Sequence, residues 1–177
     1  RLMEWFWNGA WRSGMQNGRM FFKDIPEAKG TLDFVGLNYY THVLVGPASV
    51  SLLKMKFPKR RQEVATEFGY PMYAEGLRRA IEFLAPLNVP IEITENGVAD
   101  AEDTLRTEHL RRHLWVLSNA VKDGHDVRSY HHWSLMDNFE WAEGYSMRFG
   151  LHRVDFESQE RTLRPSGEVY KAIVGRR

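Results

Sequence analysis

Three short apolar runs along the chain predict β-strands. Residues 32–40, 89–95 and 127–134 are rich in β-branched and aromatic side chains, and each run ends in polar groups. The Asn-Gly dipeptide at residues 96–97 is a strong turn signal directly after the second run. After the third run we expect an aromatic-rich loop over residues 136–149.

Helical periodicity fills the intervals between these runs. Residues 73–84 carry apolar side chains at helical spacing. A second helix is expected to be capped by Asp103 or Thr104 and ended by Gly124. One apolar stripe of this helix is predicted to face the core, formed by Leu110, Leu114, Leu117 and Val121. Ser166 is a candidate cap for a last short helix. The order strand-helix-strand-helix-strand implies right-handed crossovers, a parallel sheet and an α/β fold.

Length and composition are those of one globular domain, which we assign to residues 1–177. Lys and Arg total 24 against 23 Asp and Glu, so no overall field favours nucleic acid or an anionic membrane. The basic run at residues 54–61 is interpreted as a solvated loop. No Cys is present, and no apolar run approaches the roughly 20 residues of a membrane helix. We therefore expect a cytoplasmic protein without membrane or nucleic-acid partners. The first residue is Arg1 rather than Met, which suggests part of a longer protein.

Polar and aromatic side chains follow each predicted strand. Because the carboxyl ends of parallel strands meet at one edge, we expect these groups to converge. Carboxylates, amides and indoles suit a carbohydrate, since hydroxyls need such partners and a pyranose stacks on Trp. A phosphate would call for a Gly-rich loop or a basic cluster, which these ends lack. For any single aromatic residue, simple packing is the competing interpretation, and Glu95 alone could be a surface residue. The converging set is Asn38, Tyr39, Tyr40, Glu95, Asn96, Trp133, Asp137, Asn138, Glu140 and Trp141.

The segments DFVGLNYYT, PIEITENG and WSLMDNFEWAEGYSMRFGL resemble the C-terminal half of glycoside hydrolase family 1, the β-glucosidase family, over about residues 30–172. The resemblance implies that Glu95 is the catalytic nucleophile and that Tyr40 donates a hydrogen bond to it. It also implies that Asn38 reaches the sugar near its reacting carbons. The sugar-binding residues implied by the same motifs are Trp133, Glu140, Trp141 and Phe149. A carboxylate at Glu140 would repel a 6-phosphate, so the expected substrate is an unphosphorylated β-glycoside or oligosaccharide.

The resemblance further implies retaining hydrolysis by two carboxylates about 5 Å apart. The family's acid/base Glu belongs to an NEP motif, and this chain contains no NEP. The family fold is a TIM (β/α)8 barrel, of which this chain resembles about the last three strand-helix units. We therefore expect the isolated chain to be inactive, or nearly so, unless an N-terminal half-barrel chain or self-association supplies the missing strands. The alternative is a catalytically inactive carbohydrate-binding or assembly fragment that retains Trp133, Glu140 and Trp141. Carboxylates that might be proposed as a substitute acid are Glu92, Asp137 and Glu143.

Two further side-chain patterns carry predictions. Glu92 is expected to point toward the helix layer, where Arg78 or Arg79 would pair with it. His109 and His113 have the i, i+4 spacing of a zinc pair, but neither a metalloprotease Glu nor a third ligand accompanies them. We therefore expect no metal and no cofactor.

Overall fold

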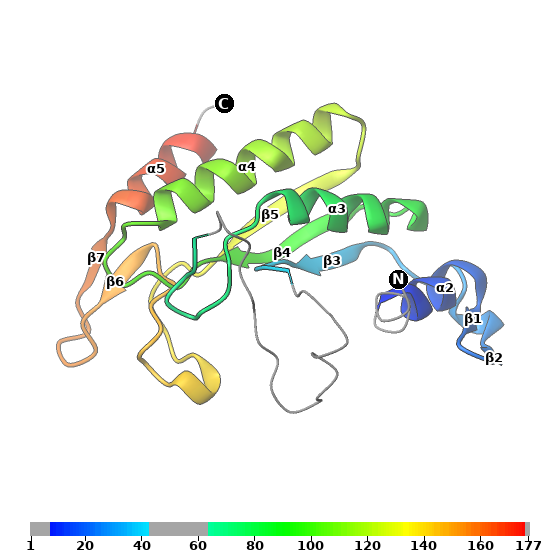
Figure 1. The fold of residues 1–177 in the computed structure, drawn as a ribbon, viewed down its shortest axis with the longest axis horizontal. Coiled ribbons are helices and arrows are strands. Elements are labelled where there is room, and N and C mark those ends of the chain that lie inside the picture. Colours follow the sequence, from blue (N-terminus) through cyan, green and yellow to red (C-terminus); the bar gives the residue numbers. More distant parts are fainter. Residues whose placement is uncertain (1–7, 43–63, 176–177) are drawn as a thin grey trace.

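A three-stranded parallel sheet forms the centre of the computed structural model, which describes residues 8–42 and 64–175. The strand order is β3-β4-β5, so β4 is central and each neighbour runs parallel to it (Figure 1). The three predicted strands and their parallel arrangement are confirmed. The basic run at residues 54–61 lies outside the described residues. The strand bounds are β3 (Val35–Asn38), β4 (Ile91–Gly97) and β5 (Val127–Trp133).

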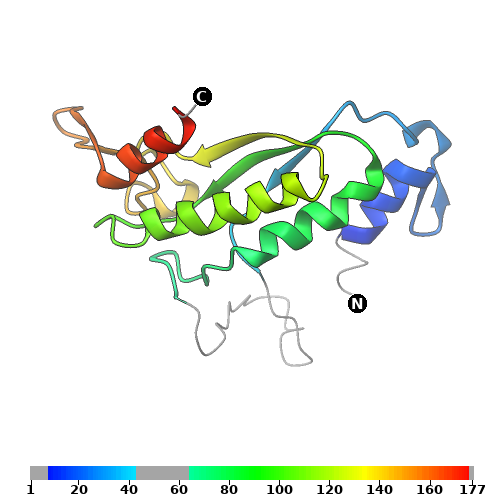
Figure 2. The ribbon, with the colours of Figure 1, turned by 90° about the horizontal axis from the view of Figure 1, so that it is seen from above.

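Helices α3 (Glu75–Leu84) and α4 (Arg106–Lys122) lie side by side on one face of this sheet (Figures 1 and 2). A third helix, α5 (Pro165–Val174), packs against α4. Each helix was expected from the sequence, and the α/β class is confirmed. No helix of the described residues covers the opposite face of the sheet (Figure 2). Below, we call this uncovered face the open side of the sheet.

Shorter elements flank the sheet at its two ends. Helix α2 packs on a two-stranded antiparallel hairpin, and Arg12 Nη1 of α2 donates to the carbonyl of Phe83 at 2.8 Å. A second antiparallel hairpin lies beyond the carboxyl ends of the parallel strands (Figure 1). These elements are α2 (Ala10–Asn17), β1 (Arg19–Met20), β2 (Lys23–Asp24), η2 (Pro26–Ala28), η4 (Ala85–Leu87), η5 (Trp141–Glu143), β6 (His152–Val154) and β7 (Arg161–Leu163).

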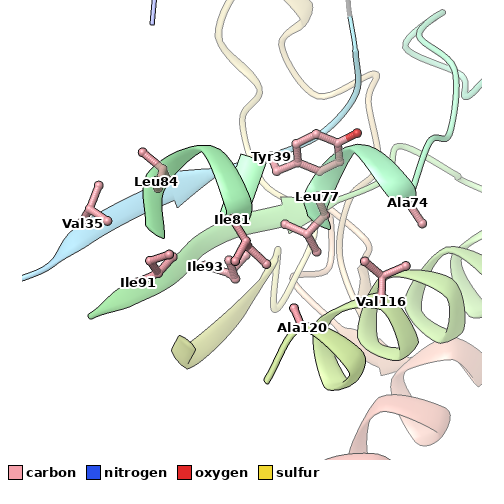
Figure 3. Close-up of a cluster of buried hydrophobic side chains, with 10 residues drawn as sticks. All are labelled: Val35, Tyr39, Ala74, Leu77, Ile81, Leu84, Ile91, Ile93, Val116 and Ala120. Atoms are coloured by element: carbon pink, nitrogen blue, oxygen red, sulfur yellow. The ribbon is translucent and has the colours of Figure 1, made fainter. Parts of the chain in front are cut away.

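The hydrophobic core lies between the parallel sheet and the helices α3 and α4 (Figure 3). Leu77 and Ile81 of α3 and Ile93 of β4 are completely buried. Burying one such side chain contributes roughly 1.5–3 kcal/mol, so this layer holds the strands in place. The other members of the cluster are Val35, Tyr39, Ala74, Leu84, Ile91, Val116 and Ala120.

Helix α4 is rotated relative to the predicted apolar stripe. Leu110 is fully buried, but Leu114 and Leu117 are only partly buried and Val121 is 46% exposed. The stripe prediction is therefore wrong in part. Hydropathy ranks arginine and histidine as surface residues, whereas here Arg106, His109 and His113 are buried. The buried face comprises Arg106, His109, Leu110, His113, Val116 and Ala120.

The N-terminus of α4 is capped by a residue other than those predicted. Asp100 Oδ2 accepts hydrogen bonds from the backbone N–H groups of Leu105 at 2.7 Å and Arg106 at 2.9 Å. Asp103 and Thr104, the predicted caps, do not fill this role. The preceding loop folds back on the helix, so the carboxylate arrives from farther along the chain than a local cap would.

Asp103 instead serves the last helix, α5. Its carboxylate accepts hydrogen bonds from both the backbone N–H of Ser166, at 2.8 Å, and the Ser166 hydroxyl, at 2.6 Å. Ser166 was predicted to cap α5, but it lies inside the first turn and donates rather than caps. The end of α4 agrees with its prediction, because Gly124 follows the helix with φ +94°, a conformation that favours glycine.

Candidate active site

An irregularity in β4 decides which way Glu95 faces. The pairing of β4 with β5 shifts register between Ile93 and Asn96. Ile93 lies in the core, and Asn96 is fully buried and accepts a hydrogen bond from Tyr130 Oη at 2.8 Å. The two intervening residues, Thr94 and Glu95, therefore both fall on the open side of the sheet. Strict alternation from Ile93 would have directed Glu95 among the helices.

Glu92 also lies on the open side, which corrects the prediction that it points toward the helices. The isoleucines on either side of Glu92 are both core residues, so alternation turns Glu92 away from the core. The prediction counted back from Glu95, and the register shift breaks that count. The arginines expected to pair with Glu92 contact other groups: Arg78 pairs with Glu82 and Asp123, and Arg79 lies over the ring of Tyr73.

Glu95 accepts a hydrogen bond from Tyr40, with 2.7 Å between Tyr40 Oη and Glu95 Oε2. The neighbouring Tyr39 points into the core and fixes this segment, since its carbonyl accepts from Asn96 Nδ2 at 2.7 Å and its hydroxyl donates to the carbonyl of Tyr73 at 2.5 Å. Alternation then turns Tyr40 toward the open side. Burial, followed by the Glu95 carboxylate, raises the pKa of Tyr40, so its hydroxyl remains a donor at neutral pH.

A second hydrogen-bonded pair lies at the carboxyl end of β5. Trp133 Nε1 donates to Glu140 Oε2 at 3.3 Å. Gly97 allows β4 to approach this point, because a Cβ there would lie 1.8 Å from the carbonyl oxygen of Trp133. Burial, and after it the negative charge of Glu140, raises the pKa of Tyr70, and the same charge adds a smaller increase to the pKa of Tyr40 after burial and Glu95. Glu140 is thus within electrostatic reach of the Tyr40–Glu95 pair.

The other expected sugar-binding residues have different surroundings. Phe149 is buried and packs edge-on against Tyr40, with 6.2 Å between ring centroids. Asn38 is exposed, and its Oδ1 accepts from Thr94 Oγ1 at 2.7 Å. Trp141 is 84% exposed and projects into solvent. Phe149 therefore lies beside Tyr40, whereas Trp141 extends away from the Tyr40–Glu95 pair into solvent.

Two aromatic residues that the sequence motifs did not assign to the site also line it. The ring of Tyr70 lies 6.4 Å from that of Tyr40, and the ring of Phe68 lies 6.2 Å from that of Phe149. Both precede α3 in a segment without strand periodicity. Their Phe-Gly-Tyr pattern is a weak aromatic signal, which was the only indication available in the sequence.

The remaining carboxylates considered as substitute acids differ in accessibility. The side chain of Asp137 is completely buried and accepts two hydrogen bonds from Arg164, at 3.0 and 3.1 Å. It is therefore unable to donate a proton to a ligand. Glu143 is exposed on the turn after Glu140.

His109 and His113 are buried, and their rings stack with 3.9 Å between centroids and 26° between planes. Imidazole lone pairs lie in the ring plane, so stacked rings do not direct them to one ion. Across residues 8–42 and 64–175, no three His, Cys, Asp or Glu side chains are grouped to hold a metal ion. No helix in the same part of the chain is long and apolar enough to cross a membrane.

Together these features define an α/β protein with a carboxylate–tyrosine pair at the carboxyl end of its central parallel strand. The sequence profile of "Glycosyl hydrolase family 1" matches residues 14–177. A beta-galactosidase of Saccharolobus solfataricus is 36% identical over 180 residues, covering 96% of this chain and 36% of that protein. A beta-glucosidase of Agrobacterium sp. is 39% identical over 166 residues, covering 85% and 36%. The solved beta-glycosidase from Pyrococcus horikoshii superposes with a TM-score of 0.83 at 35% identity, covering 97% of this chain and 42% of that one.

The chain belongs to glycosyl hydrolase family 1. It spans about a third of the length of the curated relatives that it matches. The predicted family is therefore confirmed, and the relatives named here are glycosidases. The roles of individual residues stay predictions.

Proposed function

We propose that this chain carries the nucleophile part of a retaining β-glycosidase site, with Glu95 as the nucleophile. The observation that carries the proposal is the hydrogen bond from Tyr40 to Glu95 at the carboxyl end of β4. The Trp133–Glu140 pair at the end of the adjacent strand supports it. Relatives named beta-galactosidase and beta-glucosidase support the reaction class.

In this reaction one oxygen of Glu95 attacks the anomeric carbon, and the bond from that carbon to the leaving oxygen breaks. A glycosyl ester of Glu95 forms, and water later hydrolyses it with net retention of configuration. Tyr40 binds Oε2, which restrains rotation of the carboxylate and leaves the other oxygen available for attack. The leaving oxygen must receive a proton, and Tyr40 is a poor acid because its pKa is raised.

The proton would come from a second carboxylate outside this chain. Retaining enzymes place their two carboxyl groups about 5–5.5 Å apart. We propose that the three parallel strands are part of a (β/α)8 barrel whose N-terminal half supplies the acid/base. Among the described strands, β3 and β5 each have one parallel neighbour, so both edges are available to continue the sheet. On this proposal the isolated chain is inactive or nearly so.

The sugar would be held by Trp133 and Glu140. The indole offers an apolar face to the pyranose, while the carboxylate accepts hydrogen bonds from sugar hydroxyls. The bond between the two side chains limits the positions that Glu140 can adopt. A carboxylate at this place repels a phosphate, so the proposal specifies an unphosphorylated glycone.

The test is intact mass after incubation with a fluorinated, activated aryl β-glucoside, which needs no general acid to glycosylate the nucleophile. We expect one label per chain, either alone or after addition of the N-terminal half of a relative. Glu95→Gln should abolish the label. Glu92→Gln is the matched control, because Glu92 lies on the same side of the same strand but three residues, or about 10 Å, from Glu95. A label that persists in Glu95→Gln would refute the assignment.

A carbohydrate-binding fragment without catalysis is the second candidate. The observation in its favour is Trp141, which is 84% exposed on the same loop as Glu140 and could stack on a sugar. Glucose binding that is lost in Trp141→Ala, with no label under any condition, would favour this function over the first.

A further inference from the structure

A buried ion pair lies at the base of the loop that carries Glu140. Both oxygens of Asp137 are engaged: Oδ1 accepts from Arg164 Nη1 at 3.0 Å and from the backbone of Gly150 at 2.9 Å. Oδ2 accepts from Arg164 Nη2 at 3.1 Å and from the backbone of Val154 at 3.2 Å. Arg148 approaches the same carboxylate to 3.7 Å. This is the two-pronged geometry that an arginine fork provides and a lysine does not.

Arg164 links this loop to the C-terminal part of the chain. Its Nη1 also donates to the carbonyl of Gly150 at 2.8 Å, and its backbone N–H donates to Leu151 at 2.9 Å. The next residue, Pro165, begins α5. The side chain of Arg164 is 6% exposed, and Asp137 is its ion-pair partner among the described residues. The ion pair therefore joins two segments that are separated by 27 residues.

The turn that presents Glu140 is held largely by contacts close to it. The backbone N–H of Glu140 bonds the carbonyl of Gly144 at 2.7 Å, within the same turn. Trp141, the next residue, is 84% exposed. The contact to the neighbouring hairpin is made by Tyr145, whose ring lies 4.4 Å from that of Phe156. Because the described backbone bonds of this turn are local, the place where the loop leaves the protein interior sets the position of Glu140.

We propose that Arg164 is a positioning residue for sugar binding, because it holds Asp137 and thereby sets where Glu140 meets Trp133. The inference rests on the proposed function of the site. Asp137 lies three residues before Glu140 and four after Trp133, so a shift of the anchor moves both ends of the Trp133–Glu140 hydrogen bond. Among the described contacts, Arg164 makes no hydrogen bond to Trp133 or Glu140, and its bond to this loop runs through Asp137.

The variant that tests this is Arg164→Lys, which keeps the positive charge but loses the two-pronged bond. Asp137→Asn is a second variant. Its side-chain NH2 group would face N–H donors in place of one of the accepting oxygens of Asp137. Arg161→Lys is the matched control, since Arg161 is exposed on β7 and its side chain bonds only the nearby carbonyl of Gln159 among the described hydrogen bonds. Far-UV circular dichroism establishes which variants are folded before they are compared.

The first readout needs no activity. The chain has six Trp residues, and Trp133→Phe identifies the indole N–H signal of Trp133 in ¹⁵N spectra. We expect this signal to move in Arg164→Lys and Asp137→Asn, while that of Trp115, which is 69% exposed on α4, stays in place. Arg161→Lys should leave the Trp133 signal unchanged. An unmoved Trp133 signal in both folded anchor variants would overturn the proposal.

The second readout is the rate of Glu95 labelling against the concentration of fluorinated glucoside. We expect Arg164→Lys to raise the half-saturating concentration by about tenfold, the loss typical of one misplaced hydrogen bond, and to change the maximal rate less than about twofold. A fall in maximal rate at unchanged half-saturation would overturn the proposal. If the original chain takes no label even with a complementing N-terminal half, the proposed function fails, and the Trp133 signal still decides whether Arg164 positions this loop.

Discussion

Acid should destabilise this protein through three histidines, His109, His113 and His132, whose ring nitrogens are buried. The ring nitrogens of His109 and His132, and Nε2 of His113, are buried without a hydrogen-bond partner among the described residues. Burial is the largest cause of lowered pKa values in all three, to about 4 for His113, to about 3 for His132 and well below the ordinary range for His109. Arg106 lowers the pKa values of His109 and His132 further. The bond between His113 and the carbonyl of His109, and then the charge of Glu75, partly oppose the effect at His113, and the backbone of Phe149 partly opposes it at His132.

The sign follows from where the protons bind. The folded state keeps these imidazoles neutral, while the unfolded chain protonates them near pH 6.5, so acid favours unfolding. Stability is therefore complete above about pH 7, falls as the pH drops through about 6.5, and levels off only below the folded-state pKa values. At pH 5 each histidine that remains neutral costs about 2 kcal/mol, from 1.5 pH units at 1.36 kcal/mol each. The summed loss from two or three such residues, about 4–6 kcal/mol, reaches the lower part of the 5–15 kcal/mol by which a typical domain is stable.

Urea denaturation at pH 7 and pH 5 measures this effect. His109→Leu should reduce the loss of unfolding free energy between the two pH values by about 2 kcal/mol. His132→Val gives a second test if the first variant fails to fold. The matched control is His131→Gln, because His131 is exposed and adjacent to His132 on the same strand. An identical pH dependence for His109→Leu, His132→Val and the original chain would refute the reasoning.

Two further predictions concern the site itself. Tyr40→Phe removes the hydrogen bond to Glu95 and should slow labelling of Glu95 by about 10- to 100-fold, since a bond to a charged group contributes roughly 1.5–3 kcal/mol. Time-resolved mass spectra measure this rate, and an unchanged rate would argue against an orienting role for Tyr40. Gly97→Ala places a methyl group 1.8 Å from the carbonyl oxygen of Trp133 and should destabilise the fold by about 1–3 kcal/mol in urea denaturation. Gly14→Ala is its control, because the new Cβ would meet its nearest neighbour at an ordinary 3.4 Å inside a helix, and equal effects of the two substitutions would contradict the steric argument.

The strand and helix pattern was readable from the sequence because it depends on local periodicity. Alternating or continuous apolar runs marked β3, β4 and β5, and helical spacing marked α3 and α4. The motifs around Tyr40, Glu95 and Trp133 also indicated which residues meet at the carboxyl edge. The carboxyl ends of parallel strands lie at the same edge of a sheet, so the strand-helix-strand order was enough to bring these ends together.

Caps and ion pairs were not readable in this way. The carboxylate of Asp103 reaches the start of α5, 63 residues away, and Arg164 joins Asp137 across 27 residues. Such partners share no sequence window, and several residues of the right type compete for each role. The rotation of α4 was missed for a related reason, since buried histidines become acceptable only when the surrounding packing is known.

The direction in which Glu95 points shows most clearly what the sequence determines and what only the tertiary structure decides. Sequence alone placed a carboxylate at the end of a strand, before a turn. Alternation has a period of two residues, so a single register shift reverses every assignment beyond it. Such a shift lies between Ile93 and Asn96, and it turns Glu95 to the open face, on the same side as Glu92. Because the shift arises from pairing with neighbouring strands, only the tertiary structure could decide which face of the sheet carries the chemistry.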